Sequence, residues 1–345
     1  MPLRTAIRDI KEKRYAPVYL LYGTESFLME EFIHFAQHEM VASDYADLNV
    51  SHYDCAETPL SMVVQDAETL PFLADQRLVV AHNAFFLTGA KPPSKVEVEP
   101  DSLLPFLEEP PNYTSLIITV QQDKLDERKR IVKALQQKAV VIPFLPLKDT
   151  ELYAWVERRA QKYKRVIKRD EAMILVERVG NDLRLLDKEI EKLSLYVGNE
   201  NGLITEEVIR LLASRTLEQD VFGLIEAVVT GKISEAFRAL YDMSKMGEEP
   251  IKLLSLFARQ IRMLLQVKMW APRGYSQQQL AQMLKVHPFA VKKAMEQARF
   301  FDEASLRRLL KILAEEDFRM KSGQVDKQLA IEMFITRVAA EKKNP

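Results

Sequence analysis

Five short apolar segments alternate with amphipathic ones in the first part of this 345-residue chain, and this alternation restricts the fold more than any other feature. Most of the five are rich in β-branched residues, as the interior strands of a parallel sheet are. They span residues 18–22, 48–53, 77–82, 115–120 and 138–144. Strands that alternate with helices predict a doubly wound α/β domain built on a parallel sheet.

The strand-like segments stop after about residue 146. Apolar residues then recur at helical spacing and predict helices at 151–164, 171–179, 183–197, 206–213 and 250–270, with Gly180 and Gly198 where C-terminal caps belong. We therefore predict three domains: an α/β domain at 1–148, a small helical domain at 149–215 and a larger helical domain at 216–345. The proline-rich segment 88–100 is interpreted as a surface loop.

Charge is unevenly divided along the chain, although the formal net charge is only −1. Residues 1–148 carry 15 Lys/Arg against 21 Asp/Glu, and residues 216–345 carry 21 against 16. An acidic front and a basic back suggest different partners at the two ends. A single cysteine, no signal-peptide core and no apolar run of about 18–20 residues predict a cytoplasmic protein without a membrane partner.

Gly23 ends the first apolar segment, and an amphipathic segment follows at once, which is how nucleotide-binding α/β domains begin. The phosphate-binding loop is missing, however. No second glycine and no lysine follow, and Glu25 would repel a phosphate. The segment 115–120 ends in Gln121 and Gln122 where a magnesium site needs Asp-Glu. We predict no nucleotide cofactor; a divergent nucleotide-dependent enzyme is an alternative that an ATPase assay would decide.

The chain offers little for metal binding or nucleophilic catalysis. His34 and His38 are four residues apart on one predicted helix, a spacing that can share a zinc ion, but no third ligand is evident. Cys55 has no histidine near it in the sequence. We therefore predict no metal site and no catalytic residue.

Residues 157–169 contain seven Lys/Arg and are the first candidate DNA contact. Such a cluster can neutralise a phosphate backbone in a salt-dependent way. A solvated helix surface explains the cluster equally well. The candidates chosen from it are Arg158, Arg159, Lys162 and Arg165.

Residues 276–298 have the spacing of a helix-turn-helix and are the second candidate DNA contact. The second helix would present Lys292, Lys293 and Gln297, which suit phosphates better than base edges. Two consecutive helices packed inside a helical domain explain the same pattern more simply.

Leu70, Pro71, Phe72 and Leu73 form an apolar run between a predicted helix and the predicted strand 77–82. Loops are normally polar, so four apolar residues in one require a reason. The run either folds back onto the core or fills a pocket of a partner. From the residues alone, core packing is the better interpretation.

Several segments, taken in order, resemble one family, the delta subunit of bacterial DNA polymerase III, which is part of the clamp loader. No single motif decides the matter, but the order and spacing are specific and the match covers most of the chain. The segments are VYLLYGTESFLMEE, LPFLADQRLVVA, GNDLRLLDKEIEKLSLYV, DVFGLIEAVVTGKISEAFRALYDMSKMGEEPIKLLSLFARQIRMLL, LKVHPFAVKKAMEQARFF and LAIEMFI.

The resemblance implies an AAA+-type fold: a RecA-like domain, a helical lid and a collar that joins a five-subunit ring. It also implies a subunit that binds no nucleotide and grips the β sliding clamp, holding one interface of the clamp open. Its other implied partners are ATPase subunits of the tau/gamma type and a delta-prime-type subunit, met through the collar, and primed DNA. Polymerase (nucleotidyltransferase) activity would belong to the holoenzyme, because this chain shows no acidic metal site for it.

The clamp-binding element of this family carries over to Leu70, Pro71, Phe72 and Leu73, which reverses the preference for core packing. Some relatives have Leu-Phe where this chain has Pro71-Phe72. A buried aromatic anchor can contribute about 2 kcal/mol or more of binding energy, and the preceding proline holds the loop extended. The alternative function is a helix-turn-helix DNA-binding protein that acts through residues 276–298.

Overall fold

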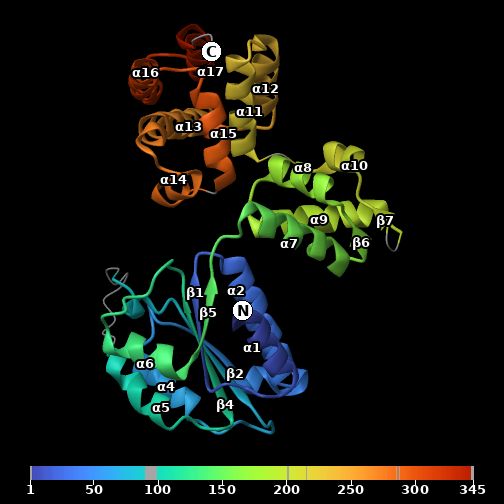
Figure 1. The fold of residues 1–345 in the computed structure, drawn as a ribbon, viewed down its shortest axis with the longest axis vertical. Coiled ribbons are helices and arrows are strands. Elements are labelled where there is room, and N and C mark those ends of the chain that lie inside the picture. Colours follow the sequence, from blue (N-terminus) through green and yellow to red (C-terminus); the bar gives the residue numbers. More distant parts are fainter. Residues whose placement is uncertain are drawn as a thin grey trace. The chain divides into compact units, whose positions relative to one another are not determined.

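The computed structural model describes residues 2–89, 99–199, 202–214, 216–284, 286 and 288–342 (Figure 1). It divides into two compact units, Met1–Pro146 and Leu147–Pro345. The first predicted domain boundary, at 148/149, lies beside this division, and the second, at 215/216, falls inside the second unit and stays a prediction. Most of the predicted loop 88–100 lies outside the described residues.

A parallel five-stranded sheet with the order β2-β3-β4-β1-β5 forms the centre of the first unit. All seven residues of β4 are buried, and β1 and β3 are nearly as well covered. The five predicted strands are confirmed to within two residues at each end. Their bounds are β1 Val18–Gly23, β2 Val50–Asp54, β3 Arg77–His82, β4 Thr114–Val120 and β5 Val140–Phe144.

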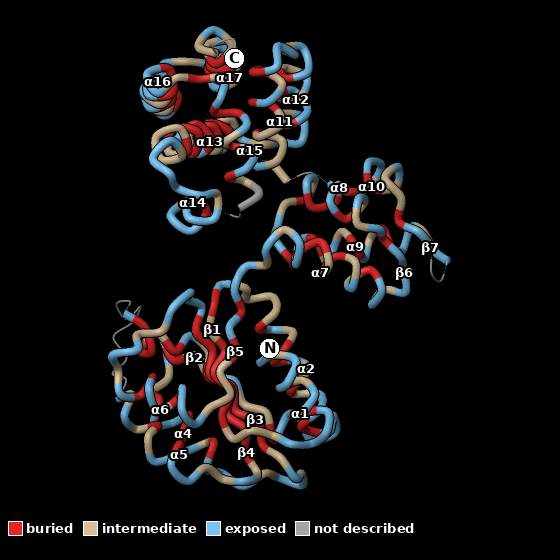
Figure 2. Tube along the Cα trace, in the orientation of Figure 1, coloured by how far each residue is buried: buried red, intermediate tan, exposed pale blue. Residues whose placement is uncertain are grey.

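Helices cover both faces of the sheet, and Figure 2 shows the buried strands between them. One face packs against α1 and α2, whose Ile10 and Phe32 meet Tyr19 and Phe144. The other face packs against α4, α5 and α6. Helix α1 was missed in the sequence because its charged composition hides the few apolar residues that it buries. The bounds are α1 Pro2–Lys11, α2 Ser26–Met40, η1 Ser43–Tyr45, α3 Ala46–Asn49, α4 Leu60–Ala67, η2 Phe85–Leu87, η3 Pro100–Leu103, α5 Leu104–Glu108 and α6 Arg130–Lys138.

The second unit begins with four helices, and the predicted bounds are again confirmed to within two residues. Gly180 and Gly198 adopt positive φ angles of 95° and 74° at the ends of α8 and α9, as C-caps. The prediction that strands stop after residue 146 was wrong in one detail, since β6 and β7 form a short parallel pair. The bounds are α7 Asp149–Lys162, β6 Arg165–Val166, α8 Arg169–Val179, α9 Leu183–Val197, β7 Gly202–Leu203 and α10 Glu206–Leu212.

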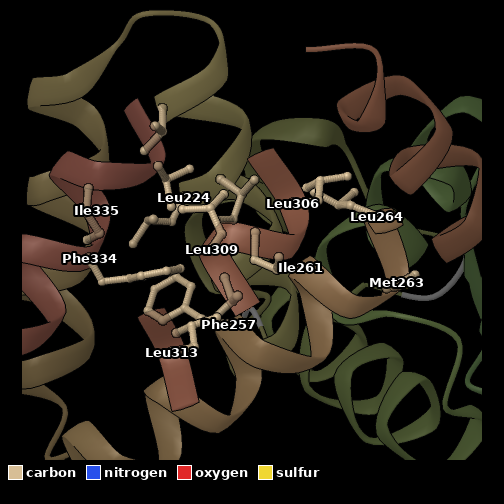
Figure 3. Packing of buried hydrophobic residues seen from close by; sticks show 14 of the residues in the cluster. Leu224, Phe257, Ile261, Met263, Leu264, Leu306, Leu309, Leu313, Phe334 and Ile335 are labelled. Carbon is tan, nitrogen blue, oxygen red and sulfur yellow. The ribbon is translucent and has the colours of Figure 1, made fainter. Parts of the chain in front are cut away.

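The rest of the second unit is helical and packs around α13, whose apolar stripe was predicted. Phe257 and Ile261 of α13 lie against Leu309 and Leu313 of α16 and against Phe334 of α17 (Figure 3). No described helix is both long enough and apolar enough to cross a membrane. The bounds are α11 Leu217–Val229, α12 Ile233–Lys245, α13 Pro250–Trp270, η4 Ala271–Arg273, α14 Gln277–Leu284, α15 Pro288–Ala298, α16 Glu303–Lys321 and α17 Lys327–Glu341.

Two histidines stack at the edge of the sheet where β2 pairs with β3. The rings of His52 and His82 are 5.4 Å apart at 10° to one another, and Nδ1 of His52 lies 3.1 Å from Nε2 of His82. Burial lowers the pKa of both imidazoles, and His52 lowers the pKa of His82 further, while Asp54 and Glu30 act in the opposite direction. The folded pair therefore resists protonation.

We expect this pair to make the first unit less stable at mildly acidic pH. An unfolded histidine takes up its proton near pH 6.5 and the folded pair only at lower pH, so the free energy of unfolding should fall as pH drops below about 6.5. His82→Gln removes the second imidazole and should reduce this fall. Urea unfolding followed by circular dichroism at about pH 7.5 and 5.5 measures the effect; an equal fall in both proteins would contradict the prediction.

Position 23 requires glycine for two reasons, its backbone conformation and the close approach of the Phe144 backbone. Its φ angle is +135°, and a Cβ there would lie 1.9 Å from the carbonyl oxygen of Phe144. Gly23→Ala should lower the free energy of unfolding of the first unit by about 2 kcal/mol or more. Gly247→Ala is the matched control, because Gly247 also has a positive φ, of +82°, but its Cβ would meet nothing within 4 Å.

The two substitutions can be followed separately because both tryptophans, Trp155 and Trp270, lie in the second unit. Gly23→Ala should shift the circular-dichroism transition more than the tryptophan-fluorescence transition. Gly247→Ala should cost only about 1 kcal/mol, from backbone strain alone. Equal losses in the two variants would show that contact with Phe144 does not matter.

Candidate functional site

The apolar tip, residues 70–73, lies in the loop that joins α4 to β3. The exposed fraction is 69% for Leu70, 57% for Phe72 and 68% for Leu73, while Pro71 is half-buried. Packing of these three side chains into the core, the interpretation first favoured by the residues alone, is therefore wrong. Three large apolar side chains on one exposed loop form a surface suited to contact with another molecule.

A buried asparagine holds the backbone of the apolar tip. Asn49, the last residue of α3, has no exposed surface. Its Oδ1 accepts a hydrogen bond from the Phe72 N–H at 2.6 Å, and its Nδ2 donates to the Phe72 carbonyl oxygen at 2.8 Å. Nδ2 also donates to the carbonyl oxygen of Tyr45 at 3.0 Å. Both peptide groups that flank Phe72 are held, and the side chain of Phe72 stays in solvent.

The two ends of the loop are also attached to the sheet. The hydroxyl of Tyr113, just before β4, donates to the carbonyl oxygen of Glu68 at 3.0 Å. The guanidinium of Arg77, at the start of β3, forms a buried ion pair with Asp66 of α4. Leu73 has a φ angle of +52°, a left-handed conformation that is uncommon outside glycine and that turns the chain directly after Phe72.

The glycine turn after β1 is closed onto β5. The N–H of Glu25 donates to the carbonyl oxygen of Phe144 at 3.0 Å, so this amide is already engaged within the fold. The hydroxyl of Thr24 donates to Oδ1 of Asp123 at 3.3 Å. Asp123 therefore brings a carboxylate to the carboxyl end of the sheet, next to Gly23, where nucleotide-binding sheets of this kind hold phosphates.

The first group of candidate DNA contacts is partly engaged in internal contacts. Arg159 forms an ion pair with Asp187 of α9, and Nε of Arg165 donates to the carbonyl oxygen of Ser194 at 2.9 Å. The basic run is also not one helix surface, because β6 interrupts it between α7 and α8. The exposed candidates on α7 are Arg158 and Lys162.

The second group, on α15, is also largely engaged inside the protein. Gln297 is buried and accepts a hydrogen bond from Gln260 of α13 at 2.8 Å. Lys293 forms an ion pair with Glu177 of α8 at 2.9 Å. Only Lys292, of the three side chains expected to face DNA, is exposed. A recognition helix needs an open polar face, and α15 packs into the core instead.

The described residues bring together no group of three or more His, Cys, Asp or Glu side chains that could hold a metal ion. Cys55 is buried, and burial raises the pKa of its thiol to about 12, so the thiol stays protonated at neutral pH.

Sequence reasoning missed two residues of these sites, Asn49 and Asp123. The partner of Asn49 is 23 residues further along the chain, and the partner of Asp123 is 99 residues earlier. No motif surrounds either residue. Their positions gave no signal either, because Asn49 lies within the predicted strand 48–53 and Asp123 follows the predicted strand 115–120 by three residues.

Family models match both parts of the chain. One model, described as DNA polymerase III, delta subunit, matches residues 19–145. A second, described as DNA polymerase III delta subunit, C-terminal domain, matches residues 218–338. Together the two models cover well over half of the 345 residues.

A sequence relative and a solved structure also match this chain over nearly its whole length. The chain is 37% identical to DNA polymerase III subunit delta of Bacillus subtilis (strain 168), over 98% of each chain. The solved structure of the Bacillus subtilis DNA clamp loader delta protein matches with a TM-score of 0.80 and 37% identity, over 99% of this chain and 100% of the other. The resemblance found in the sequence is confirmed, and so is a parallel α/β domain followed by a helical part: the chain belongs to the family of the DNA polymerase III delta subunit.

Proposed function

We propose that this chain binds the ring-shaped β sliding clamp through residues 70–73 and holds one interface of the ring open for loading onto primed DNA. The observation that carries the proposal is the exposure of Phe72 on a backbone fixed by Asn49. The structural relative at 37% identity is itself a DNA clamp loader delta protein, and an exposed apolar tip is a surface suited to contact with a partner protein.

The energetics of the apolar tip suit insertion into a preformed pocket. An aromatic anchor such as Phe72 can contribute about 2 kcal/mol or more when a pocket removes it from water. Leu70 and Leu73 lie on either side of it and can exclude water from the contact. Pro71 restricts Leu70 to extended backbone conformations, which lowers the ordering cost of binding.

Opening the ring needs no chemistry in this subunit. A clamp exists in closed and open states, and a ligand shifts their populations only by binding one state better than the other. The tip has to bind the open state more tightly than the closed one. Residues 70–73 can therefore favour the open ring by binding alone. The free energy for each loading cycle then comes from ATP hydrolysed elsewhere in the assembly.

We further propose that the chain binds no nucleotide and is a non-catalytic subunit of the polymerase holoenzyme. The missing lysine, the engaged amide of Glu25 and the carboxylate of Asp123 beside Thr24 all disfavour a bound phosphate. The sheet is parallel, as in nucleotide-binding domains, and contacts within the protein close the turn that would hold ATP.

The helical part of the chain would serve assembly. We propose that residues 149–215 form a lid and residues 216–345 a collar, which contacts ATPase subunits of the tau/gamma type and a delta-prime-type subunit in the cytoplasm. Exposed basic residues could then approach the primed DNA held by the assembly; these are Arg158, Lys162 and Lys292. Within 276–298, the residues that the structure describes do not favour a separate helix-turn-helix function.

Phe72→Ala should weaken binding to the clamp at least tenfold, because it removes the aromatic anchor. The measurement is calorimetric titration of the full chain with the β sliding clamp of Bacillus subtilis. Phe318→Ala is the matched control: Phe318 lies on α16 and has an exposed fraction of 66%, so the same substitution removes a similarly exposed ring away from the tip.

The control variant should bind the clamp with the affinity of the unmodified protein. Absence of any clamp binding by the unmodified protein would overturn the proposed function. Equal binding by the Phe72→Ala variant and the unmodified protein would leave the family unchanged but would move the contact away from residues 70–73.

The isolated chain should neither bind nor hydrolyse ATP. Titration with ATP and Mg²⁺ at millimolar concentration should give no binding heat, and no phosphate should be released above the background rate. Dissociation constants in the micromolar range would contradict the proposal, since they would require a phosphate site that the Gly23 turn does not provide.

A further inference from the structure

We infer that Asn49 is a positioning residue for clamp binding, which sets the conformation of Phe72 before any partner arrives. This inference rests on the proposed function of residues 70–73. Asn49 itself cannot touch a partner, because it has no exposed surface. Its effect on binding has to pass through the backbone that it holds.

Three hydrogen bonds join the side chain of Asn49 to two segments of the chain. A side-chain amide offers one carbonyl oxygen as acceptor and two N–H donors, and all three groups are used. The acceptor takes the Phe72 N–H, and the donors reach the carbonyl oxygens of Phe72 and Tyr45. A buried amide without partners is costly, so this position tolerates asparagine only while the tip keeps its present shape. The amide and the tip therefore order each other.

The pair of bonds to Phe72 copies the way a neighbouring strand would hold one residue. In a hydrogen-bonded pair of an antiparallel sheet, one residue exchanges both an N–H and a carbonyl bond with a single partner. Here the side chain of Asn49 takes the place of that partner, at 2.6 and 2.8 Å. With both flanking peptides fixed and Leu73 in a left-handed turn, the ring of Phe72 is left facing solvent.

Such fixing raises affinity without adding a contact. A free loop loses backbone entropy when a partner orders it, and that loss weakens binding. Because Asn49 orders the loop when the chain folds, this backbone entropy is lost during folding and not during binding. The partner this suits is a protein with a preformed apolar pocket, because a rigid anchor gains nothing from a surface that has to reshape itself.

The test is a double-mutant cycle in the full chain, with clamp affinity measured by calorimetry. The proteins are the unmodified chain, Asn49→Ala, Phe72→Ala and the double variant. We expect Asn49→Ala alone to bind about tenfold more weakly. We expect the double variant to bind no more weakly than Phe72→Ala alone, because positioning has no effect once the ring is gone.

Two outcomes of the cycle would overturn the inference. Unchanged affinity of Asn49→Ala would show that the asparagine serves the fold alone. Losses that multiply in the double variant would show that it acts independently of Phe72. The proposed function fails in a different way, through an unmodified protein that does not bind or a Phe72→Ala variant that binds normally.

A matched control separates positioning from general loss of a buried hydrogen bond. Thr88 is also buried in the first unit, donates from Oγ1 to the carbonyl oxygen of Phe85 at 2.9 Å, and follows the other end of β3. Thr88→Val removes this bond and should leave clamp affinity unchanged. A loss equal to that of Asn49→Ala would overturn the inference.

A second measurement needs no variant and covers the case in which Asn49→Ala fails to fold. The N–H of Phe72 lies in an exposed loop, yet Asn49 accepts its hydrogen bond. Hydrogen exchange in the unmodified protein should therefore be at least tenfold slower at Phe72 than at an unprotected loop amide. Exchange of this amide at the unprotected rate would overturn the inference.

Discussion

Burial of the central strands on both faces is the constraint on which the first unit depends. β4 is buried on both faces and pairs with β1 on one side and with β3 on the other, so its position and register in the sheet are fixed. The register sets Arg77 of β3 opposite Thr114 of β4. Tyr113, one residue earlier, then reaches the end of α4. The base of the apolar tip is thus a direct consequence of strand pairing.

Strand pairing alone leaves the tip itself undetermined. Residues 70–73 lie beyond the sheet, and three of their side chains bury little surface, so apolar packing cannot order them. Polar contacts do this instead. Asn49 acts on Phe72 from inside the domain, and the ion pair of Arg77 with Asp66 holds the start of β3 to α4. Buried polar contacts therefore hold the backbone that presents the exposed apolar side chains of residues 70–73.

At the opposite end of the sheet, the glycine turn after β1 is closed by contacts within the protein. Gly23 lies so close to the backbone of Phe144 that no side chain fits, and the Glu25 amide is bonded to the same carbonyl. A phosphate loop needs several free amides and a lysine. Closing the turn onto β5 satisfies the Glu25 amide within the protein, which is one reason for our proposal that this domain binds no nucleotide.

The chain's alternating pattern determined the five strands to within two residues. β1, β3 and β4 are buried on both faces and so require continuous apolar segments, while the partly covered β2 and β5 still carry enough apolar residues to be found. The glycines at the ends of two predicted helices also determined the C-caps of α8 and α9, since positive φ angles favour glycine. The position of residues 70–73 between a helix and a strand was visible as well. Local signals of this kind act over a few residues and can be read without a structure.

Only the tertiary structure decided which polar residues matter. It paired Asn49 with Phe72, Thr24 with Asp123, and Lys293 with Glu177. It also showed that the apolar tip is exposed and that Gln297 is buried. Hydropathy could not separate the exposed residues from the buried ones, because the hydropathy of a residue type is the same wherever the residue lies. Exposure is set by which distant segments cover a residue, and the packing of the whole domain decides that.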